Sequence, residues 1–427
     1  MTNLSIILEQ IKKHELDEQF KDIYYDDEQM IAYQNNRYYS AIQKYAELFG
    51  EGDIEIYSAP GRTEVCGNHT DHQNGMVLAA SINLDAIAIV GANDQPEIKI
   101  LSEGYPLITV DLNDINLNKE EEGSTTALIK GVINGMKERG LAVGPFKAYI
   151  TSDVLSGSGL SSSAAFEAMI GTIISGLFNN MSVSPVEIAK IGQYAENVYF
   201  GKPCGLMDQM ACSVGGFVNI DFKDPEHPVV NKVDFDISEV GYSLCIVDTK
   251  GSHADLTEDY ALVPAEMNEV AAFFGKEHLS EIDKEEFLSK IPELSGKTGD
   301  RAILRAFHFF NENERVQKAV DALKENRFDD FLQAVKDSGN SSYKYLQNVY
   351  SNKYVQTQPV PITLALSEYI LENNGVSRVH GGGFAGTIQA FVKNSFVSEY
   401  KQFIENVLGK GACHVLKIRK YGGIKIK

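Results

Sequence analysis

Basic residues, cysteines and long apolar runs are all scarce in this sequence of 427 residues, and each scarcity excludes a class of protein. Its 39 Lys and Arg residues face 59 Asp and Glu residues, so the formal net charge of −20 argues against nucleic acid or an anionic membrane surface as the main partner. The five cysteines are scattered without a Cys-x-x-Cys spacing, which indicates neither a disulfide framework nor a zinc site and suits a reducing cytoplasm. No apolar run approaches the roughly 18 residues of a membrane helix, and the first residues lack a leader pattern, so we expect a cytoplasmic protein without membrane contact.

The length of the chain predicts two domains, because one hydrophobic core does not usually serve this many residues. Hydrophobic residues make up 43% and charged residues 23%, as in soluble globular proteins. A polar, proline-containing stretch at 221–236 gives the predicted boundary, with one domain over 1–225 and the other over 226–427.

Apolar periodicity predicts a mixed α+β order of elements. Charged faces of the N-terminal helices are expected to be solvated. The turn residues Ala59-Pro60-Gly61-Arg62 are expected to end the first strand. Strands are predicted at 54–58, 77–90, 146–151, 242–248, 387–392 and 414–418, and helices within 4–50 and at 123–141, 166–178, 185–201, 258–275, 281–291, 301–325, 328–347, 361–373 and 395–408.

The stretch Gly157-Ser158-Gly159-Leu160-Ser161-Ser162-Ser163-Ala164-Ala165 stands between a predicted strand and an apolar helix. Glycine lets the backbone approach an anion, and a helix that begins at the serines would direct unpaired N–H groups and its positive dipole end at that anion. The stretch therefore favours a phosphate site, although a plain turn with a helix cap suits the same residues. No Gly-x-x-x-x-Gly-Lys-[Ser/Thr] occurs, so a nucleotide here would not be held by a P-loop.

Three further stretches place polar groups beside turns. Gly67-Asn68-His69-Thr70-Asp71-His72 separates two apolar strands and suits either a cleft wall or a solvated loop. Glu196 either lies at the edge of an apolar helix face, where a carboxylate needs a partner, or is a solvated helix glutamate. Asp208 follows a glycine turn as either a catalytic group or a helix cap. Four glycines within 381–386 imply close backbone approach to a ligand or to another loop.

Together these loops resemble the three motifs of the GHMP small-molecule kinases, with details similar to the galactokinase family. The stretch from Pro60 to His72, Pro-Gly-Arg-Thr-Glu-Val-Cys-Gly-Asn-His-Thr-Asp-His, resembles the family signature Pro-Gly-Arg-Val-Asn-Leu-Ile-Gly-Glu-His-Thr-Asp-Tyr. The serine-rich stretch resembles the ATP loop, and Gly381-Gly382-Gly383-Phe384-Ala385-Gly386 resembles the third motif Gly-Ala-Gly-Phe-Gly-Gly. Further matches are 195–209 and 311–316, so the resemblance covers roughly residues 54 to 418.

The resemblance implies phosphoryl transfer from MgATP to the anomeric C1 hydroxyl of galactose, and a two-domain architecture. This architecture combines an N-terminal ribosomal-S5-like α/β domain with a C-terminal ferredoxin-like α+β domain, as a monomer whose ligands are a small sugar and ATP. By the same carry-over, Asp208 approaches the hydroxyl and Arg62 stabilises the transferring group. The sugar would be bound by Asn68, His69, Thr70, Asp71, Gly205 and Tyr260; ATP by Gly157, Ser158, Gly159, Leu160, Ser161, Ser162 and Ser163; and magnesium by Ser163 and Glu196.

Departures from the family pattern bear on the sugar more than on the reaction. Asn68 replaces a glutamate that contacts the sugar near C6, and an amide would tolerate a carboxylate there. Asn68 and the stretch Asp71-His72-Gln73 together make a galacturonokinase the alternative to a galactokinase. Two further departures are Glu64, which replaces an asparagine of the family, and Val263-Pro264, which replaces a basic pair. A non-catalytic sugar sensor is disfavoured by the intact Ser163-Ala164, and a mevalonate or homoserine kinase by His69-Thr70-Asp71.

Overall fold

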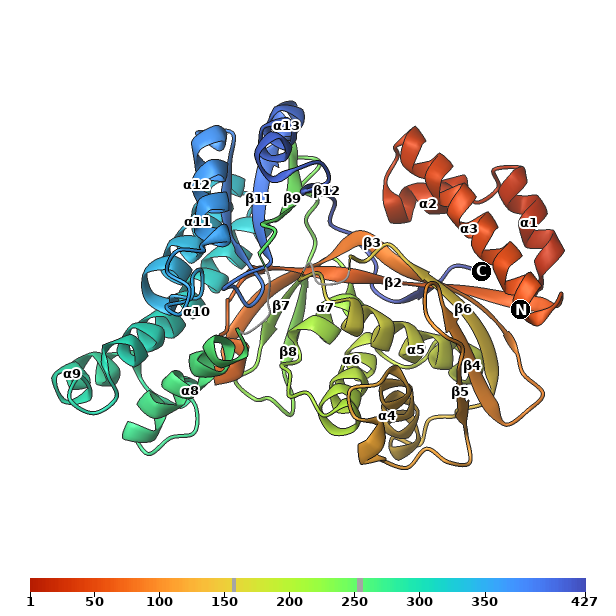
Figure 1. The fold of residues 1–427 in the computed structure, drawn as a ribbon, viewed down its shortest axis with the longest axis horizontal. Coiled ribbons are helices and arrows are strands. Elements are labelled where there is room, and N and C mark those ends of the chain that lie inside the picture. The colour runs from red at the N-terminus through yellow and green to blue at the C-terminus, as the bar shows by residue number, and fades with distance from the viewer. Residues whose placement is uncertain (156–158, 252–255) are drawn as a thin grey trace.

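Two β-sheets form the framework of the protein, and helices cover both (Figure 1). The computed structural model describes residues 1–155, 159–251 and 256–427. Among these residues, nine strands form the larger sheet, with the order β1-β2-β3-β6-β4-β5, while β7 and β8 continue from β3 and β13 pairs with β2. The strands are β1 (Thr2–Asn3), β2 (Asp53–Cys66), β3 (Met76–Ala92), β4 (Glu97–Ser102), β5 (Ile108–Asp111), β6 (Phe146–Ser152), β7 (Phe217–Asp221), β8 (Val229–Val233), β9 (Tyr242–Asp248), β10 (Gly375–His380), β11 (Thr387–Lys393), β12 (Cys413–Leu416) and β13 (Ile424–Lys425).

Both faces of the larger sheet are buried along its long strands β2 and β3. Successive side chains of a strand point to opposite faces, so Ile54 and Ile56 pack under the N-terminal helices while Tyr57 and Ala59 enter the core on the other side. Figure 1 shows α1–α3 on one face and α4–α7 on the other. The helices are α1 (Leu4–Lys12), α2 (Asp17–Tyr24), α3 (Glu28–Phe49), α4 (Thr125–Glu138), α5 (Ser162–Asn179), α6 (Pro185–Tyr194), α7 (Met207–Val214), α8 (Thr257–Phe273), α9 (Lys284–Leu294), α10 (Asp300–Lys324), α11 (Phe328–Ser341), α12 (Pro359–Leu371) and α13 (Val397–Leu408).

A buried charge cluster joins the N-terminal helices to the sheet. Asp85 of β3 has no exposed side-chain surface and binds Arg37 of α3 at 2.7 Å and Arg419 at 2.8 Å. The hydroxyl of Tyr24 donates to the same carboxylate at 2.6 Å, and Ser58 also binds it. The expectation that the charges of these helices are all solvated is therefore wrong for Arg37, whose partner lies 48 positions further along the chain.

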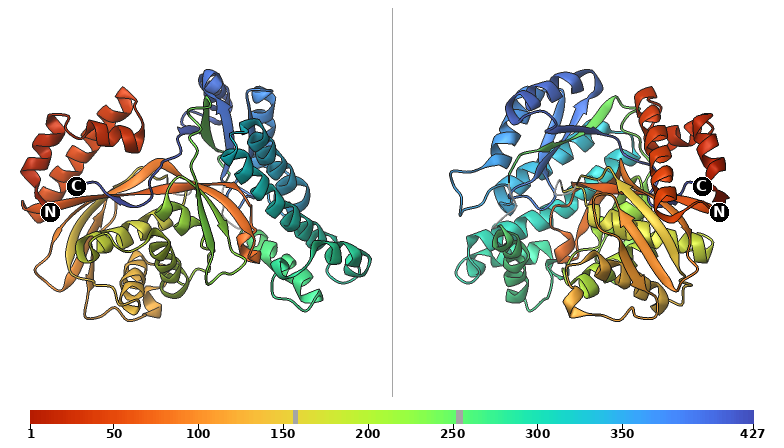
Figure 2. Two further views of the ribbon diagram at one scale, coloured as in Figure 1. Left: turned by 180° about the vertical axis from the view of Figure 1, so that it is seen from behind. Right: turned by 45° about the vertical axis from the view of Figure 1, so that its right-hand side comes forward.

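The smaller sheet, with the order β10-β11-β9-β12, is antiparallel and packs against the helices α11 to α13. After β12 the chain returns to the larger sheet, where β13 pairs with β2, so the two termini lie near each other (Figure 2). Strand β8, which follows residue 225, pairs with β7 in the larger sheet. The division into 1–225 and 226–427 stays a prediction.

The mixed α+β class is confirmed, as are the helices and strands that the apolar periodicity predicts. The predicted turn at 59–62 is wrong, because β2 continues through it to Cys66 with a register shift between Pro60 and Arg62. Gly61 is needed there for close packing: a Cβ at this position would lie 2.8 Å from the Leu160 carbonyl oxygen. Within the described part of the chain, no helix is both long and apolar enough to cross a membrane.

Candidate active site

An ion pair between Arg62 and Asp208 lies at the centre of the site. The Nε and Nη2 atoms of Arg62, in β2, each donate to one oxygen of Asp208, in α7, at 2.7 Å. The hydroxyl of Ser161 donates to Oδ2 of Asp208 at 2.6 Å. These three residues line a cavity of about 250 Å³, as do Ser163 and Glu196. Asp208 lies in the first turn of α7, where Leu206 is the cap residue, and 31% of its side-chain surface is exposed.

Electrostatics hold this pair in its charged form. Burial opposes the ionisation of Asp208, but the charge and hydrogen bonds of Arg62, the Ser161 hydroxyl and the charge of Lys202 together outweigh it and hold the pKa of the carboxyl below its ordinary value. The pKa of Arg62 is raised, since the attraction of Asp208 outweighs burial. Asp208 is therefore a weak base that stays ionised at neutral pH.

Helix α5 begins at Ser162, as the sequence predicts, and its first turn faces the same cavity. Ser161, at the cap position, has a positive φ of 60°, and its hydroxyl is directed at Asp208. Arg62 holds the two residues that precede Ser161, because its backbone N–H donates to the Leu160 carbonyl at 3.1 Å and its Nη1 donates to the Gly159 carbonyl. The first turn of a helix has N–H groups without intrahelical partners, and they favour anions. The predicted ATP-binding residues Gly157 and Ser158 lie outside the described residues.

The buried carboxylate Glu196 forms the other side of the cavity, and Gln209 links it to a second buried carboxylate, Glu167. Glu196 accepts hydrogen bonds from Lys202 at 3.2 Å and from Gln209 at 2.8 Å, so it has the partners that its burial requires. Gln209 also donates to Glu167 at 3.1 Å. Within the described residues the Oε1 atom of Glu167 has no hydrogen-bond partner, and burial together with the charge of Glu196 raises the pKa of Glu167.

The oxygen atoms in this part of the cavity suit a hard cation. Ser163 offers a hydroxyl and Glu196 a carboxylate, and Mg²⁺ prefers oxygen ligands while keeping several of its waters. No group of three or more His, Cys, Asp or Glu side chains suited to a metal occurs in the described ranges. The residues therefore fit a magnesium ion bound by few protein ligands.

Three consecutive glycine carbonyls connect the third motif to the predicted sugar residues. Asn68 Nδ2 donates to the Gly381 carbonyl at 2.8 Å, and the Tyr260 hydroxyl donates to the Gly383 carbonyl at 2.7 Å. Between them, His69 Nε2 lies 3.0 Å from the carbonyl oxygen of Gly382. Gly382 must be glycine, because a Cβ would lie 2.6 Å from the ring of Tyr260. The loop that contains Asn68 and His69 and the glycine loop at 381–383, more than 300 residues apart in sequence, thus form one wall of the predicted sugar site.

The protonation state of His69 follows from these contacts. Burial, and after it the neighbouring His72, lowers the pKa of His69 to about 3. The ring is therefore neutral, and since the Gly382 carbonyl can only accept, Nε2 carries the proton. This tautomer leaves Nδ1 as a hydrogen-bond acceptor.

Asp71 and Gly205 lie in direct contact, which brings the 67–72 loop against the turn before α7. A Cβ at Gly205 would lie only 2.1 Å from Oδ2 of Asp71, so this approach requires glycine. Oδ1 of Asp71 accepts from the His72 N–H at 3.0 Å. Thr70 is buried, and its hydroxyl lies 2.8 Å from the Gly67 carbonyl, where it closes the loop. Sugar binding by Thr70 stays a prediction.

Asn68 lies within a network of protein groups. Its Nδ2 donates to Glu64 as well as to Gly381, each at 2.8 Å, and its Oδ1 accepts from Asn348 at 2.6 Å and from Ser342 at 3.3 Å. The two departures from the family pattern, Glu64 and Asn68, therefore contact each other. Sugar binding by Asn68 stays a prediction, and in this structure its amide is bound by protein on both sides.

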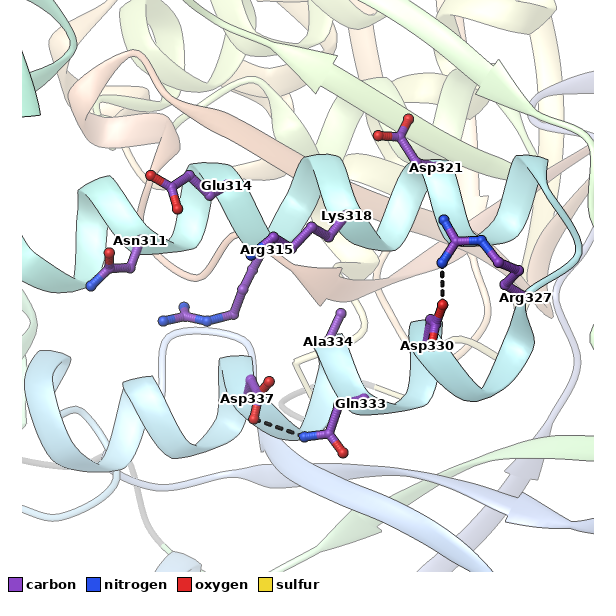
Figure 3. Close-up of a pocket in the computed structure, with 10 residues that line it drawn as sticks. All are labelled: Asn311, Glu314, Arg315, Lys318, Asp321, Arg327, Asp330, Gln333, Ala334 and Asp337. Carbon is purple, nitrogen blue, oxygen red and sulfur yellow. Dashed lines mark hydrogen bonds and ion pairs between the residues drawn. The ribbon is translucent and has the colours of Figure 1, made fainter.

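Helix α10 holds the ends of the 67–75 loop, which explains the sequence match at 311–316. Glu312 accepts from the Gly67 N–H at 3.0 Å, and Asn313 accepts from the Met76 N–H at 2.7 Å. The opposite side of the same helix lines a cavity of about 450 Å³ between α10 and α11, with charges of both signs (Figure 3). None of the residues to which the sequence analysis assigns a role lies in this second cavity.

Two residues that contribute to the site have no assigned role in the sequence analysis. Lys202 lines the cavity beside Glu196, and Gln209 bridges the two buried carboxylates. The sequence could have identified Lys202, because it is a lysine between a glycine and a proline in a very acidic chain, close to the predicted metal ligand Glu196. Gln209 directly follows Asp208 but carries no pattern of its own.

Comparison with known proteins agrees with this arrangement of motifs. The family model "GHMP kinases N terminal domain" matches residues 127–216, and "Galactokinase galactose-binding signature" matches residues 43–92. The galactokinase of Actinobacillus pleuropneumoniae serotype 5b (strain L20) is 29% identical over 377 residues, which covers 85% of this chain and 92% of that protein. That of Limosilactobacillus reuteri (strain DSM 20016) is 28% identical over 382 residues, which covers 86% and 93%.

Solved structures share the fold. A crystal structure of Lactococcus lactis galactokinase complexed with galactose matches with a TM-score of 0.76 and 26% identity, over 90% of this chain and 98% of that chain. A mevalonate kinase structure matches with a TM-score of 0.59 at 17% identity, over 85% and 98%, which shows the fold alone. These matches confirm the predicted resemblance: the chain is similar to the GHMP kinases and, over most of its length, to the galactokinases among them.

Proposed function

We propose that the protein transfers the γ-phosphoryl group of MgATP to the anomeric C1 hydroxyl of galactose, which gives galactose 1-phosphate and ADP. The observation that carries this proposal is the Arg62–Asp208 pair, which lines one cavity with the first turn of α5, while Gly205, three residues before Asp208, contacts Asp71 of the sugar motif. Phosphoryl transfer needs this combination, because its transition state asks for positioning and for neutralisation of charge.

Asp208 positions the C1 hydroxyl by accepting its hydrogen bond. Its lowered pKa makes it a poor base for early deprotonation, which a loose transition state tolerates. The hydroxyl proton passes to Asp208 as the O–P bond forms. Arg62 stabilises charge on the transferring group while it keeps Asp208 ionised and aligned.

The first turn of α5 binds the phosphates of ATP through backbone N–H groups and the hydroxyls of Ser161, Ser162 and Ser163. Lys202 adds a second positive charge to the cavity, which an anionic ligand needs in a chain of net charge −20. Ser163 and Glu196 hold Mg²⁺, which when bound neutralises phosphate charge.

His69, Asp71, Gly205 and Tyr260 form the sugar site. Asp71 accepts hydrogen bonds from adjacent hydroxyl groups, and the neutral His69 accepts at Nδ1. A preference for galacturonate would require the Asn68 amide to face C6 of the sugar. That amide is bound by Glu64, Gly381, Asn348 and Ser342, so galactose is the preferred substrate.

The test is ADP formation by the purified protein with MgATP and one sugar at a time: galactose, galacturonate, glucose, arabinose or none. We expect turnover with galactose, little with glucose, and the background rate without sugar. Turnover with galacturonate alone would contradict the assignment of galactose. Galactose binding without ADP formation would instead support the sensor.

A further inference from the structure

We propose that the N-terminal helix α3 positions the nucleotide side of the active site through Tyr33 and Arg37, which together hold Asp153. The hydroxyl of Tyr33 donates to Oδ1 of Asp153 at 2.9 Å, and Nη1 of Arg37 lies 3.0 Å from Oδ2. Asp153 stands at the end of β6, where the chain leaves the sheet towards the serine-rich stretch. Both family models begin after Arg37, at residues 43 and 127, so neither includes this contact.

The held carboxylate is two residues away from the cavity. Val154 follows Asp153 and is buried against Gly61, where a Cβ would lie 3.0 Å from its Cγ1 atom. Leu155 comes next and lines the cavity together with Arg62 and Asp208. A displacement of Asp153 is therefore transmitted to the cavity wall and to the residue that precedes Arg62.

Arg37 is anchored independently of Asp153, so it can serve as a fixed point. Its Nη1 binds Asp85 at 2.7 Å, and its Nη2 donates to the Asp85 carbonyl at 2.8 Å. The Asp153 N–H donates to the same carbonyl at 2.9 Å. Asp153 is thus tied to the buried charge cluster through its backbone and to α3 through its side chain. Opposite it, Arg62 holds the far side of the stretch at Gly159 and Leu160. Both approaches to the first turn of α5 are therefore fixed by arginines.

Tyr33→Phe is the sharpest variant, because Tyr33 is half exposed and loses only its hydroxyl. Tyr421→Phe is its matched control. The Tyr421 hydroxyl donates to Asp22 at 2.6 Å and so joins the same N-terminal helices to the body of the protein through a different carboxylate. Asp153→Asn removes the charge that Arg37 binds, and the double variant tests whether Tyr33 acts through Asp153.

This inference rests on the proposed function in one respect, the assignment of the cavity to a nucleotide. The affinity for MgADP is therefore measured by calorimetry in the absence of sugar, so that the result does not depend on sugar phosphorylation. We expect Asp153→Asn to weaken MgADP binding by about 3- to 10-fold and Tyr33→Phe by about 2- to 3-fold. Tyr421→Phe should leave it unchanged, and Tyr33→Phe should add nothing to Asp153→Asn. KM for galactose should stay the same in every variant that folds.

The inference is overturned if Tyr33→Phe binds MgADP as tightly as the wild-type protein does, or if Tyr33→Phe and Tyr421→Phe lose equal affinity for MgADP. The affinity of Tyr33→Phe decides the question even where Asp153→Asn does not fold. A wild-type protein that binds MgADP but phosphorylates no sugar would overturn the proposed function alone. A wild-type protein that binds no nucleotide would overturn both.

Discussion

The pairs Arg62–Asp208 and Arg37–Asp85 have the same chemistry and the same 2.7 Å contact, but they differ in what surrounds the carboxylate. Asp85 has no exposed side-chain surface, and Arg37, Arg419, Tyr24 and Ser58 bind it from all sides. Asp208 faces a cavity and is 31% exposed. The difference teaches that an arginine–aspartate pair joins two elements when it is enclosed by protein, and is available for chemistry when one side is left open to a ligand.

The largest effect on activity is expected at the open pair. Asp208→Ala should lower kcat by about 10³-fold or more, because the positioning group and the proton acceptor for the C1 hydroxyl are lost together. The unfolding temperature should change by only a few degrees. Steady-state kinetics and calorimetry check both expectations, with Asp208→Asn as the matched variant. A loss of folding with either variant would make Asp208 a structural residue.

At the enclosed pair Arg37–Asp85 we expect a large loss of stability and a small effect on activity. Asp85→Asn leaves two buried arginines without their shared anion, and breaking a buried ion pair costs about 3–5 kcal/mol. Urea unfolding should show this loss of stability, while any protein that remains folded should keep KM for galactose. A stability loss equal to that of Asp208→Asn would remove the contrast between the two pairs.

Much of the open pair could be predicted from the sequence, since Arg62, Ser161, Glu196 and Asp208 belong to the quoted motifs and the structure places all four around one cavity. The enclosed cluster could not be predicted. Arg37 lies on a helix whose charges suit solvent, and nothing local indicates that its partner is Asp85 in a distant strand.

The same limit explains the two local predictions that depend on tertiary contacts. Pro60-Gly61 has the composition of a turn, but the approach of Leu160 makes this glycine a packing residue inside β2. Asn68 suits a polar cleft, yet its partners Ser342, Asn348 and Gly381 come from far along the chain. Residue propensities and motif spacing do not predict such contacts between distant parts of the chain.

A pH experiment extends this comparison to His69, which is half-buried among protein groups and is also proposed to face the sugar. Its pKa is lowered to about 3 in the folded protein, whereas an unfolded histidine takes up a proton near pH 6.5. Below about pH 6.5 the unfolded state therefore binds more protons, so stability falls as the pH decreases towards 3. Between pH 7.5 and 5, His69→Gln should lose fewer degrees of unfolding temperature than the wild-type protein.

In this experiment some pH dependence should remain in the variant, because burial also lowers the pKa values of His308 and His380. Equal slopes in the two proteins would contradict a neutral His69. The KM for galactose of the wild-type protein should not change between pH 5.5 and 8, since His69 does not titrate there.

The smallest effect is expected at Lys202, an exposed charge that lies on the open side of the cavity. Its side chain is 64% exposed and its ion pair with Glu196 is 3.2 Å long, so it should contribute the modest free energy of a surface pair. Lys202→Met should raise KM for MgATP by about 2- to 5-fold and leave kcat nearly unchanged. A large fall in kcat would instead place Lys202 among the catalytic groups.

The position of phosphorylation distinguishes a sugar-1-kinase from any other sugar kinase. Proton-coupled ³¹P NMR of the reaction of the wild-type protein with MgATP and galactose identifies the carbon that receives the phosphoryl group. The account predicts a new sugar phosphate whose phosphorus couples to the anomeric proton, and no such product with Asp208→Ala. Coupling to the C6 protons, or no sugar phosphate at all, would contradict it.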